Sequence, residues 1–393
     1  MGDDHSPTVG ELQEMCAQFA AAFPDLRLYR ALSEGAAGDA DVAGLLLAAR
    51  PGQARPILLL AALHDLVLAH PELPAARWYP SVTGAPVPDG DPWPDVRAAA
   101  LAHADRLREV IATRATQTNE VNRAVYLGAL LARAAADVPD TPVVLLEMGA
   151  SAGLLLDLDR YRIEVGVPGT PGAVVLGDPS SRVVCRGELL RGSAEGLALP
   201  RIVERVGLDL DPVDADDAAE LRWLEACLWP DQPERLERFR RAVAALRTAR
   251  PRLVRGDMIG DLADTARGAV HRAESPLRGI QPEAGGARSA HLVVVSSWAL
   301  TYTPAERRPD VAAALAALAR DGRPVSWLTA EPPGCAPGLP EVDLGSRGAE
   351  AANPETVLGA RRWRDGRELP AEIVGWGHPH GAWLHLTSGT SPH

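Results

Sequence analysis

Apolar residues in the first third of the chain recur every three to four positions, the spacing of one face of an α-helix. Proline and glycine interrupt this pattern at Pro51 and Gly52 and again through residues 71–94. The segments that keep the helical spacing are 9–23, 41–50, 55–70, 95–114 and 119–137. We therefore predict an all-helical N-terminal domain, or cap, over residues 1–140.

The pattern changes at Pro142, where short apolar runs begin to alternate with helical segments. The runs expected to form strands are 143–147, 161–165, 173–176, 182–185, 252–255, 291–296, 324–330, 372–376 and 382–386. Helical spacing lies between several of them, at 218–228, 234–248 and 309–320. Strands that alternate with helices predict an α/β fold, with a Rossmann-like, mostly parallel sheet and helices on both faces. We place this domain at residues 141–393.

Local composition adds three details to the predicted α/β domain. The turn at 377–381 is short and contains Gly and Pro, so we expect the last two strands to pair antiparallel. Residues 183–250 are expected to be a helical insertion. Residues 266–290 are rich in Gly, Ala, Arg and Pro and lack periodicity, which predicts a surface loop.

Charge and residue usage narrow the possible functions. The net charge of −12 argues against nucleic acid as the main partner, because a phosphate backbone needs a basic protein face. All 40 basic residues are arginine, so a lysine Schiff base and a P-loop lysine are excluded. The N-terminus lacks a signal-peptide core, and the longest apolar run, at 56–69, is too short to cross a bilayer. We expect a cytoplasmic protein that acts on a small molecule, with its oligomeric state left open.

Residues 143–154, which read VVLLEMGASAGL, carry the clearest functional pattern. A strand ends at Glu147, a turn of small residues runs from Gly149 to Gly153, and a leucine-rich segment follows as the expected start of a helix. Small residues let the backbone approach a ligand closely, and a helix N-terminus offers free N–H groups. Two chemistries use this layout. One is a cofactor site of the E-x-G-x-G-x-G type, with Glu147 on a ribose, and the other is a G-x-S-x-G elbow with Ser151 as nucleophile.

A serine hydrolase built on Ser151 is the weaker of these two interpretations. Esterase-type sheets have several strands before the elbow, and a loop between them supplies half of the oxyanion hole. Here the elbow lies on the first strand, and no HGG-type loop precedes it. Asp257, His378 and His380 follow in the order of an acid and a base, but such residues are common. The two histidines lack an evident third ligand, so no metal site is expected.

A cofactor site requires polar residues at the ends of later strands, because ligands of open parallel sheets bind at the carboxyl ends of strands. The segment RLVRGDM provides Asp257 and Met258. The segment HLVVVSS ends in Ser296 and Ser297, and Tyr302 follows five residues later. The strand endings therefore favour the cofactor site over the hydrolase.

The segments VVLLEMGASAG, RGDM and HLVVVSSWALTY, in this order, resemble the strand motifs of class I S-adenosylmethionine-dependent methyltransferases. The wider chain, from about residue 50 to its end, resembles DUF2332, an uncharacterised actinobacterial family. The segments that carry this second resemblance are 116–120 (TQTNE), 147–154 and 229–232 (WPDQ). The methyltransferase resemblance implies methyl transfer from S-adenosylmethionine to a small-molecule acceptor.

The methyltransferase resemblance also implies roles for single residues. Glu147 would hold the ribose, or a water near the methionine amino group, while Asp257 and Met258 would contact the adenine. The residues expected to bind the cofactor are Glu147, Gly149, Ser151, Gly153, Asp257, Met258 and Ser297. Two departures stand out: Ser151 replaces a glycine of the motif, and the acid that should end the second strand has only Glu164 and Asp178 as nearest candidates.

Other polar residues are candidates for the acceptor side of the site. Glu120, Tyr302 and Glu331 are expected to bind the acceptor or remove its proton. The residues expected to contact the substrate are Gln117, Asn119, Arg123, Trp229, Asp231 and Gln232. An ordinary structural role also fits many of these residues, since both segments lie where helices begin or end. Because no acid ends the strand at 291–296, a non-catalytic protein that binds a nucleotide or another small molecule is a further alternative.

Overall fold

The computed structural model describes residues 7–117, 119–275, 289–341 and 355–387, and the chain forms two compact units. Unit 1 consists of residues 1–119 and 216–240, and unit 2 consists of residues 120–215 and 241–393. The chain therefore leaves unit 2 once, contributes a short segment to unit 1 and returns. The helix expected at 119–137 belongs to unit 2.

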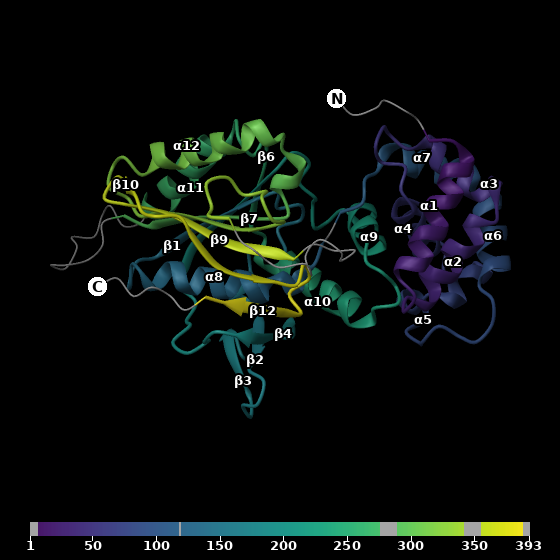
Figure 1. The fold of residues 1–393 in the computed structure, drawn as a ribbon, viewed down its shortest axis with the longest axis horizontal. Helices are drawn as coiled ribbons and strands as arrows, with labels where there is room; N and C mark the ends of the chain where they lie inside the picture. The colour runs from purple at the N-terminus through teal and green to yellow at the C-terminus, as the bar shows by residue number, and fades with distance from the viewer. Residues whose placement is uncertain (1–6, 118, 276–288, 342–354, 388–393) are drawn as a thin grey trace. The chain divides into compact units, whose positions relative to one another are not determined.

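The described part of unit 1 is helical, as the spacing of apolar residues predicts (Figure 1). Its helices are α1 (Val9–Ala22), α2 (Arg27–Ala37), α3 (Ala40–Ala43), α4 (Pro56–Ala69), α5 (Pro80–Thr83), α6 (Trp93–Ala102), α7 (Ala104–Thr113) and α9 (Ala218–Ala226). The single helix expected at 95–114 is broken at His103, whose φ of −116° and ψ of 26° are not helical. Apart from His64 and Asp65, helix α4 is apolar, and it is buried, so the other helices pack around it.

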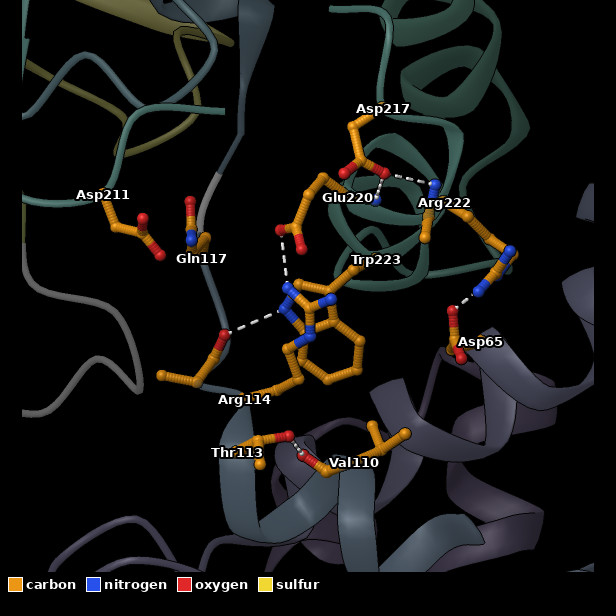
Figure 2. A network of polar contacts seen from close by, with 12 residues as sticks. Asp65, Val110, Thr113, Arg114, Gln117, Asp211, Asp217, Glu220, Arg222 and Trp223 are labelled. Atoms are coloured by element: carbon orange, nitrogen blue, oxygen red, sulfur yellow. Dashed lines mark hydrogen bonds and ion pairs between the residues drawn. The ribbon is translucent and has the colours of Figure 1, made fainter. Parts of the chain in front are cut away.

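Ion pairs and hydrogen bonds between charged side chains connect the segment 216–240 to the rest of unit 1 (Figure 2). Asp65 on α4 accepts hydrogen bonds from Arg222 of α9 at 2.8 Å and from Arg106 of α7 at 3.2 Å. Arg114 forms an ion pair with Glu220 at 2.5 Å. Because Asp65 is buried and paired with two arginines, its charge is compensated where water is excluded. The short segment is thus an integral part of the helical unit.

Unit 2 is built on a large mixed, mostly parallel sheet of 12 strands, so the protein belongs to the α/β class. Its strands are β1 (Val143–Met148), β2 (Arg162–Gly166), β3 (Ala173–Gly177), β4 (Val184–Arg191), β5 (Ile202–Asp209), β6 (Arg252–Arg255), β7 (His291–Ser297), β8 (Val325–Glu331), β9 (Thr356–Arg364), β10 (Arg367–Glu368), β11 (Glu372–Gly377) and β12 (Trp383–Leu386). Their order is β3-β2-β4-β12-β11-β9-β8-β7-β1-β5-β6, with β10 beside β9. The antiparallel pairing expected for the last two strands is confirmed.

Helices cover the central strands of unit 2 on opposite faces (Figure 1). Alternate residues of β1, including Leu146, pack against α11 (Leu262–Glu274) and α12 (Arg308–Leu318). Helix α8 (Ala124–Ala136) lies on the other face, and nearly all its residues are buried. The prediction of a surface loop at 266–290 is wrong for its first part, because α11 continues to Glu274. Residues 276–288 lie outside the described residues.

Strands β4 and β5 lie within the range 183–250, for which a helical insertion was expected. Strand β5 pairs with β1 on one side and with the edge strand β6 on the other, within the parallel region. Two charged residues interrupt the apolar run of β5, so the sequence pattern did not predict this strand. Glu204 pairs with Arg272 at 2.6 Å, and Arg205 pairs with Asp159 at 2.6 Å. Ion pairs with distant residues therefore let a sequence with two charged residues form an interior strand of the sheet.

In the described part of the chain, no helix combines the length and the apolar character needed to span a membrane.

Candidate functional site

The candidate site lies at the carboxyl ends of five parallel strands in unit 2, in the order β6-β5-β1-β7-β8. From β1 the chain adds β5 and β6 on one side, and it then adds β7 and β8 on the other. Strand order therefore reverses between β1 and β7. In open α/β sheets this reversal opens a crevice at the carboxyl ends of the strands.

The turn after β1 adopts the left-handed backbone that its small residues predict. Gly149, Ser151 and Gly153 have φ values of 71°, 51° and 77°. A methyl group added at Gly149 would lie 2.7 Å from Cβ of Ala299, so a side chain does not fit there. The turn is therefore packed closely against the segment that follows β7.

The helix expected after Gly153 is wrong, because this segment forms turns that end in the short 3-10 helix η4 (Leu158–Arg160). Side chains donate hydrogen bonds to carbonyl groups that would accept backbone hydrogen bonds in an α-helix. The Tyr161 hydroxyl donates to the Leu154 carbonyl, and Arg205 Nε donates to the Leu156 carbonyl at 3.1 Å. Any ligand at this turn would therefore contact the backbone groups of the turn itself, because no α-helix begins there.

Asp209, at the end of β5, is a site residue that the sequence reasoning missed. Its Oδ2 accepts a hydrogen bond from the Ser151 backbone at 2.7 Å, and its Oδ1 accepts one from the Asp211 backbone at 2.9 Å. The candidates named from the sequence, Glu164 and Asp178, lie on β2 and after β3, away from the strand beside β1. The sequence did contain a signal for Asp209, an acid directly after Gly207 and Leu208. It was missed because β5 itself was not predicted as a strand.

A hollow of about 290 Å³ borders the turn on the β5 side. Its lining comprises Ala152, Pro212, Val213, Asp214, Ala215, Leu246, Arg250, Pro251 and Leu253. Most of these side chains are apolar, so the hollow suits a flat, weakly polar group better than a charged one.

Glu147 lies at the end of β1 and is only 5% exposed. Its Oε2 has no hydrogen-bond partner among the residues that the structure describes. The pKa of this carboxyl is raised to about 8, mainly by burial and also by the nearby charge of Asp209, while Arg123 acts in the opposite direction. A buried carboxyl without a partner is costly, which is a common property of binding sites.

Arg123 approaches the same region from the 3-10 helix η3 (Val121–Arg123), which precedes α8. It is 4% exposed and donates from Nη1 to the Ser297 carbonyl at 3.1 Å and from Nε to the Pro379 carbonyl at 3.2 Å. Its guanidinium lies 5.7 Å from the centre of the Trp298 ring. Within the described residues it forms no ion pair.

Glu331 completes this buried group from the end of β8. Its Oε1 accepts hydrogen bonds from the backbone of Ala299 at 3.1 Å and Leu300 at 3.3 Å. Burial raises its pKa to about 7, against the lowering effects of those two N–H groups, of the Ser296 side chain and of Arg123. The fully buried carboxyl therefore titrates close to neutral pH.

Two further predicted residues adjoin this group. Glu120 is buried, and its Oε1 accepts a hydrogen bond from the Asn122 backbone at 2.9 Å. The Ser297 hydroxyl lies 3.1 Å from the Tyr126 hydroxyl. The structure thus brings Glu120, Arg123, Glu147, Ser297 and Glu331, all named from the sequence, to one edge of the sheet.

Three predicted residues lie outside the buried group. Asp257 is exposed, and its Oδ1 accepts from the backbone of Gly260 at 2.6 Å and Ile259 at 3.1 Å, which organises the turn before α11. Met258 is half-buried and accepts a hydrogen bond from Thr303. Tyr302 is 76% exposed, so it does not belong to the buried group around Glu331.

The remaining predicted residues belong to unit 1. Trp229 packs against Phe23 with ring centres 5.0 Å apart. Asp231 accepts hydrogen bonds from two backbone N–H groups of α2, and Gln232 accepts one from Arg235 at 2.6 Å. The described members of the 116–120 segment in this unit are half-buried Thr116 and Gln117 and buried Asn119; Thr118 lies outside the described residues. A structural role within unit 1 accounts for the contacts of Trp229 and Asp231.

In the described part of the chain, no group of three or more His, Cys, Asp or Glu residues is arranged to hold a metal ion.

Comparison with known proteins places the chain in a family. A search of curated proteins finds no match. The model of the family described as "Uncharacterized protein conserved in bacteria (DUF2332)" matches residues 13–385, so the chain belongs to the DUF2332 family.

Proposed function

We propose that unit 2 is a Rossmann-like domain that binds S-adenosylmethionine and transfers its methyl group to a small-molecule acceptor. The observation that carries this proposal is the set of acids at the strand ends. Glu147 ends β1, Asp209 ends the neighbouring strand β5, and Asp257 follows β6. A nucleoside cofactor that lies across these strand ends would meet one carboxyl group at each strand.

Each of these residues has a distinct task in the proposed site. Asp209 would accept hydrogen bonds from the ribose hydroxyls, while its bond to Ser151 fixes the turn. Gly149 leaves no side chain between the turn and the methionine portion of the cofactor. The apolar hollow beside Ala152 suits the adenine ring, and Asp257, which follows β6, would accept a hydrogen bond from the adenine.

The bound cofactor would supply an electrophilic methyl group. The residues of the chain would orient the acceptor against it and exclude water, because a sulfonium needs no further activation by the protein. Glu331, with a pKa of about 7, can accept a proton from an acceptor that must lose one. Buried Glu120 is a second candidate for contact with the acceptor.

A calorimetric titration with S-adenosylmethionine and S-adenosylhomocysteine tests the proposal. We expect both to bind the wild type and Asp209→Asn to weaken both by roughly 10- to 100-fold, the effect of losing a hydrogen bond to a charged group. Asp178→Asn is the matched control, because Asp178 is an exposed acid in the turn after β3. The melting temperature of each variant without ligand reports whether it folds. A folded wild type that binds neither compound at millimolar concentration would refute the proposal.

A serine hydrolase is the second candidate, favoured by the positive φ of Ser151, 51°, which a nucleophile elbow also requires. A fluorophosphonate probe separates the two functions. Labelling of the wild type that disappears in Ser151→Ala, with no binding of the cofactor, would replace methyl transfer by hydrolysis. Cofactor binding without transfer of a labelled methyl group to any acceptor would favour a binding protein instead.

A further inference from the structure

We propose that Arg123, Glu147 and Glu331 form a binding site for the amino-acid end of a ligand, a group that carries both an ammonium and a carboxylate. The proposal deepens the function argued above, because it identifies the ligand chemistry of the innermost part of that site. It needs no assumption about which molecule supplies the group. The methionine end of the cofactor and an amino acid that serves as acceptor are the two sources.

The first argument is the unpaired charge of Arg123. Arg123 is only 4% exposed, yet its hydrogen bonds go to two neutral carbonyl groups, those of Ser297 and Pro379. Guanidinium keeps its proton in proteins, so a buried positive charge remains without an anion. Neither of these hydrogen bonds uses its Nη2, and a carboxylate is the anion that fits the fork of two nitrogens.

The second argument is the pair of carboxyl groups, of Glu147 and Glu331, in the same region. The field of Arg123 reaches both Glu147 and Glu331, since it lowers the pKa of each. Neither carboxyl lies within 4.0 Å of an arginine nitrogen, however, so neither neutralises Arg123 directly. Oε2 of Glu147 is buried and has no partner among the described residues. A donor group is needed there, and an ammonium provides three N–H bonds.

Together these observations favour a zwitterion over a simple anion. A phosphate would be held by Arg123 but repelled by Glu147, Glu331 and Asp209 once they are ionised. A simple amine would be held by the carboxyls and would leave Arg123 uncompensated. An amino-acid group satisfies both halves of the site and brings no net charge into the buried region.

Binding should also release protons. Glu147 carries its proton at neutral pH, because its pKa is raised to about 8, and an ammonium beside it would displace that proton. The charged groups whose fields reach Glu147 are Asp209 and Arg123, and Arg123 also reaches Glu331. Titrations in two buffers of different ionisation enthalpy would report this release directly.

The test compares S-adenosylhomocysteine with 5′-methylthioadenosine, which lacks the amino-acid end. We expect the first to bind the wild type at least roughly tenfold more tightly, and Arg123→Lys to remove this difference while 5′-methylthioadenosine binds as before. Arg133→Lys is the matched control, in helix α8, which directly follows Arg123; Arg133 donates to the Thr387 carbonyl at 2.7 Å. Glu147→Gln provides a second variant, with loss of the proton release as its readout.

A second arm identifies the source of the zwitterion. L-Methionine and L-glutamate are added to protein saturated with S-adenosylhomocysteine, and the melting temperature is measured. A further rise that depends on Arg123 would assign the site to an amino-acid acceptor, while a rise seen only in the absence of the nucleoside would assign it to the cofactor.

The outcomes separate this inference from the proposed function. If neither nucleoside binds but the amino acids bind through Arg123, methyl transfer is refuted and the zwitterion site stands. If both nucleosides bind equally well, and neither amino acid binds in an Arg123-dependent way, the cofactor site stands and the zwitterion site is refuted.

Discussion

The residues with the strongest functional signal are those whose charges are buried without full compensation. Glu147 was identified from the sequence because it ends an apolar run before a turn of small residues. Arg123 and Glu331 were named as well, but their burial and their proximity to Glu147 follow only from the fold. Asp209 could not be assigned from the sequence, because its role depends on β5 lying beside β1.

Glu147 should make stability depend on pH. Its pKa is raised from 4.5 to about 8 in the folded protein, so between these values the folded state holds a proton that the unfolded chain has lost. This contribution to stability is present at low pH and is lost as the pH rises through about 8, with a slope of roughly 1.4 kcal/mol per pH unit. Glu331 adds a similar slope up to about pH 7. The interval from pH 7 to 8 therefore isolates Glu147.

We expect Glu147→Gln to flatten the fall in the free energy of unfolding between pH 7 and 8, measured by urea unfolding at several pH values. His64 and His291, whose pKa values are lowered to about 4 and about 3 by burial, change stability only below about pH 6.5 and do not interfere. Asp178→Asn is the control, since hydrogen bonds from Ser180 lower the pKa of this exposed carboxyl. Equal pH profiles for wild type and Glu147→Gln would show that Glu147 is ionised in the folded protein.

At the scale of helices and strands, the sequence predicts the elements whose stability is local. Helix α4 and strand β1 are largely apolar, apart from His64 and Asp65 in α4 and Glu147 in β1, and both were expected close to their observed bounds. Helix α2 and strand β5 were missed, because each depends on distant partners. The N-cap of α2, Leu26, supplies no side-chain hydrogen bond, and β5 contains charged residues paired with other segments.

Helix α2 receives its N-terminal cap from a residue about 200 positions away. Asp231 accepts hydrogen bonds from the backbone of Leu28 at 2.7 Å and of Tyr29 at 3.2 Å. We expect Asp231→Ala to destabilise unit 1 by about 1–2 kcal/mol, the usual effect of losing such a cap. Hydrogen exchange of the first turn of α2 is the appropriate measurement, because it separates a local effect from a global one. Unchanged exchange at Leu28 and Tyr29 would favour the substrate-binding role predicted from the sequence.

At the scale of the whole molecule, the sequence predicts the order of a helical region followed by an α/β region, but not how the chain is shared between them. Apolar spacing alone assigns α8 to the preceding helices, because it is a helix like them. In the structure its buried face covers the sheet of unit 2. Residues 216–240 likewise read as part of an insertion, although their partners Asp65 and Arg114 lie in unit 1. Such assignments depend on contacts between distant segments, which periodicity does not report.

This sharing of the chain can be tested with two truncated proteins, one beginning at residue 120 and one at residue 141, in which a Gly-Ser linker replaces residues 216–240. They differ only in the segment that contains α8. Val125, Leu127, Leu130 and Leu131 of α8 are buried, and their burial contributes about 6–12 kcal/mol at about 1.5–3 kcal/mol for each side chain. This amount is comparable with the whole stability of a typical domain, about 5–15 kcal/mol. We therefore expect the longer protein to unfold cooperatively in urea and the shorter one to lack a cooperative transition. Cooperative unfolding of the shorter protein at a similar midpoint would instead place the boundary near residue 140, where the sequence pattern puts it.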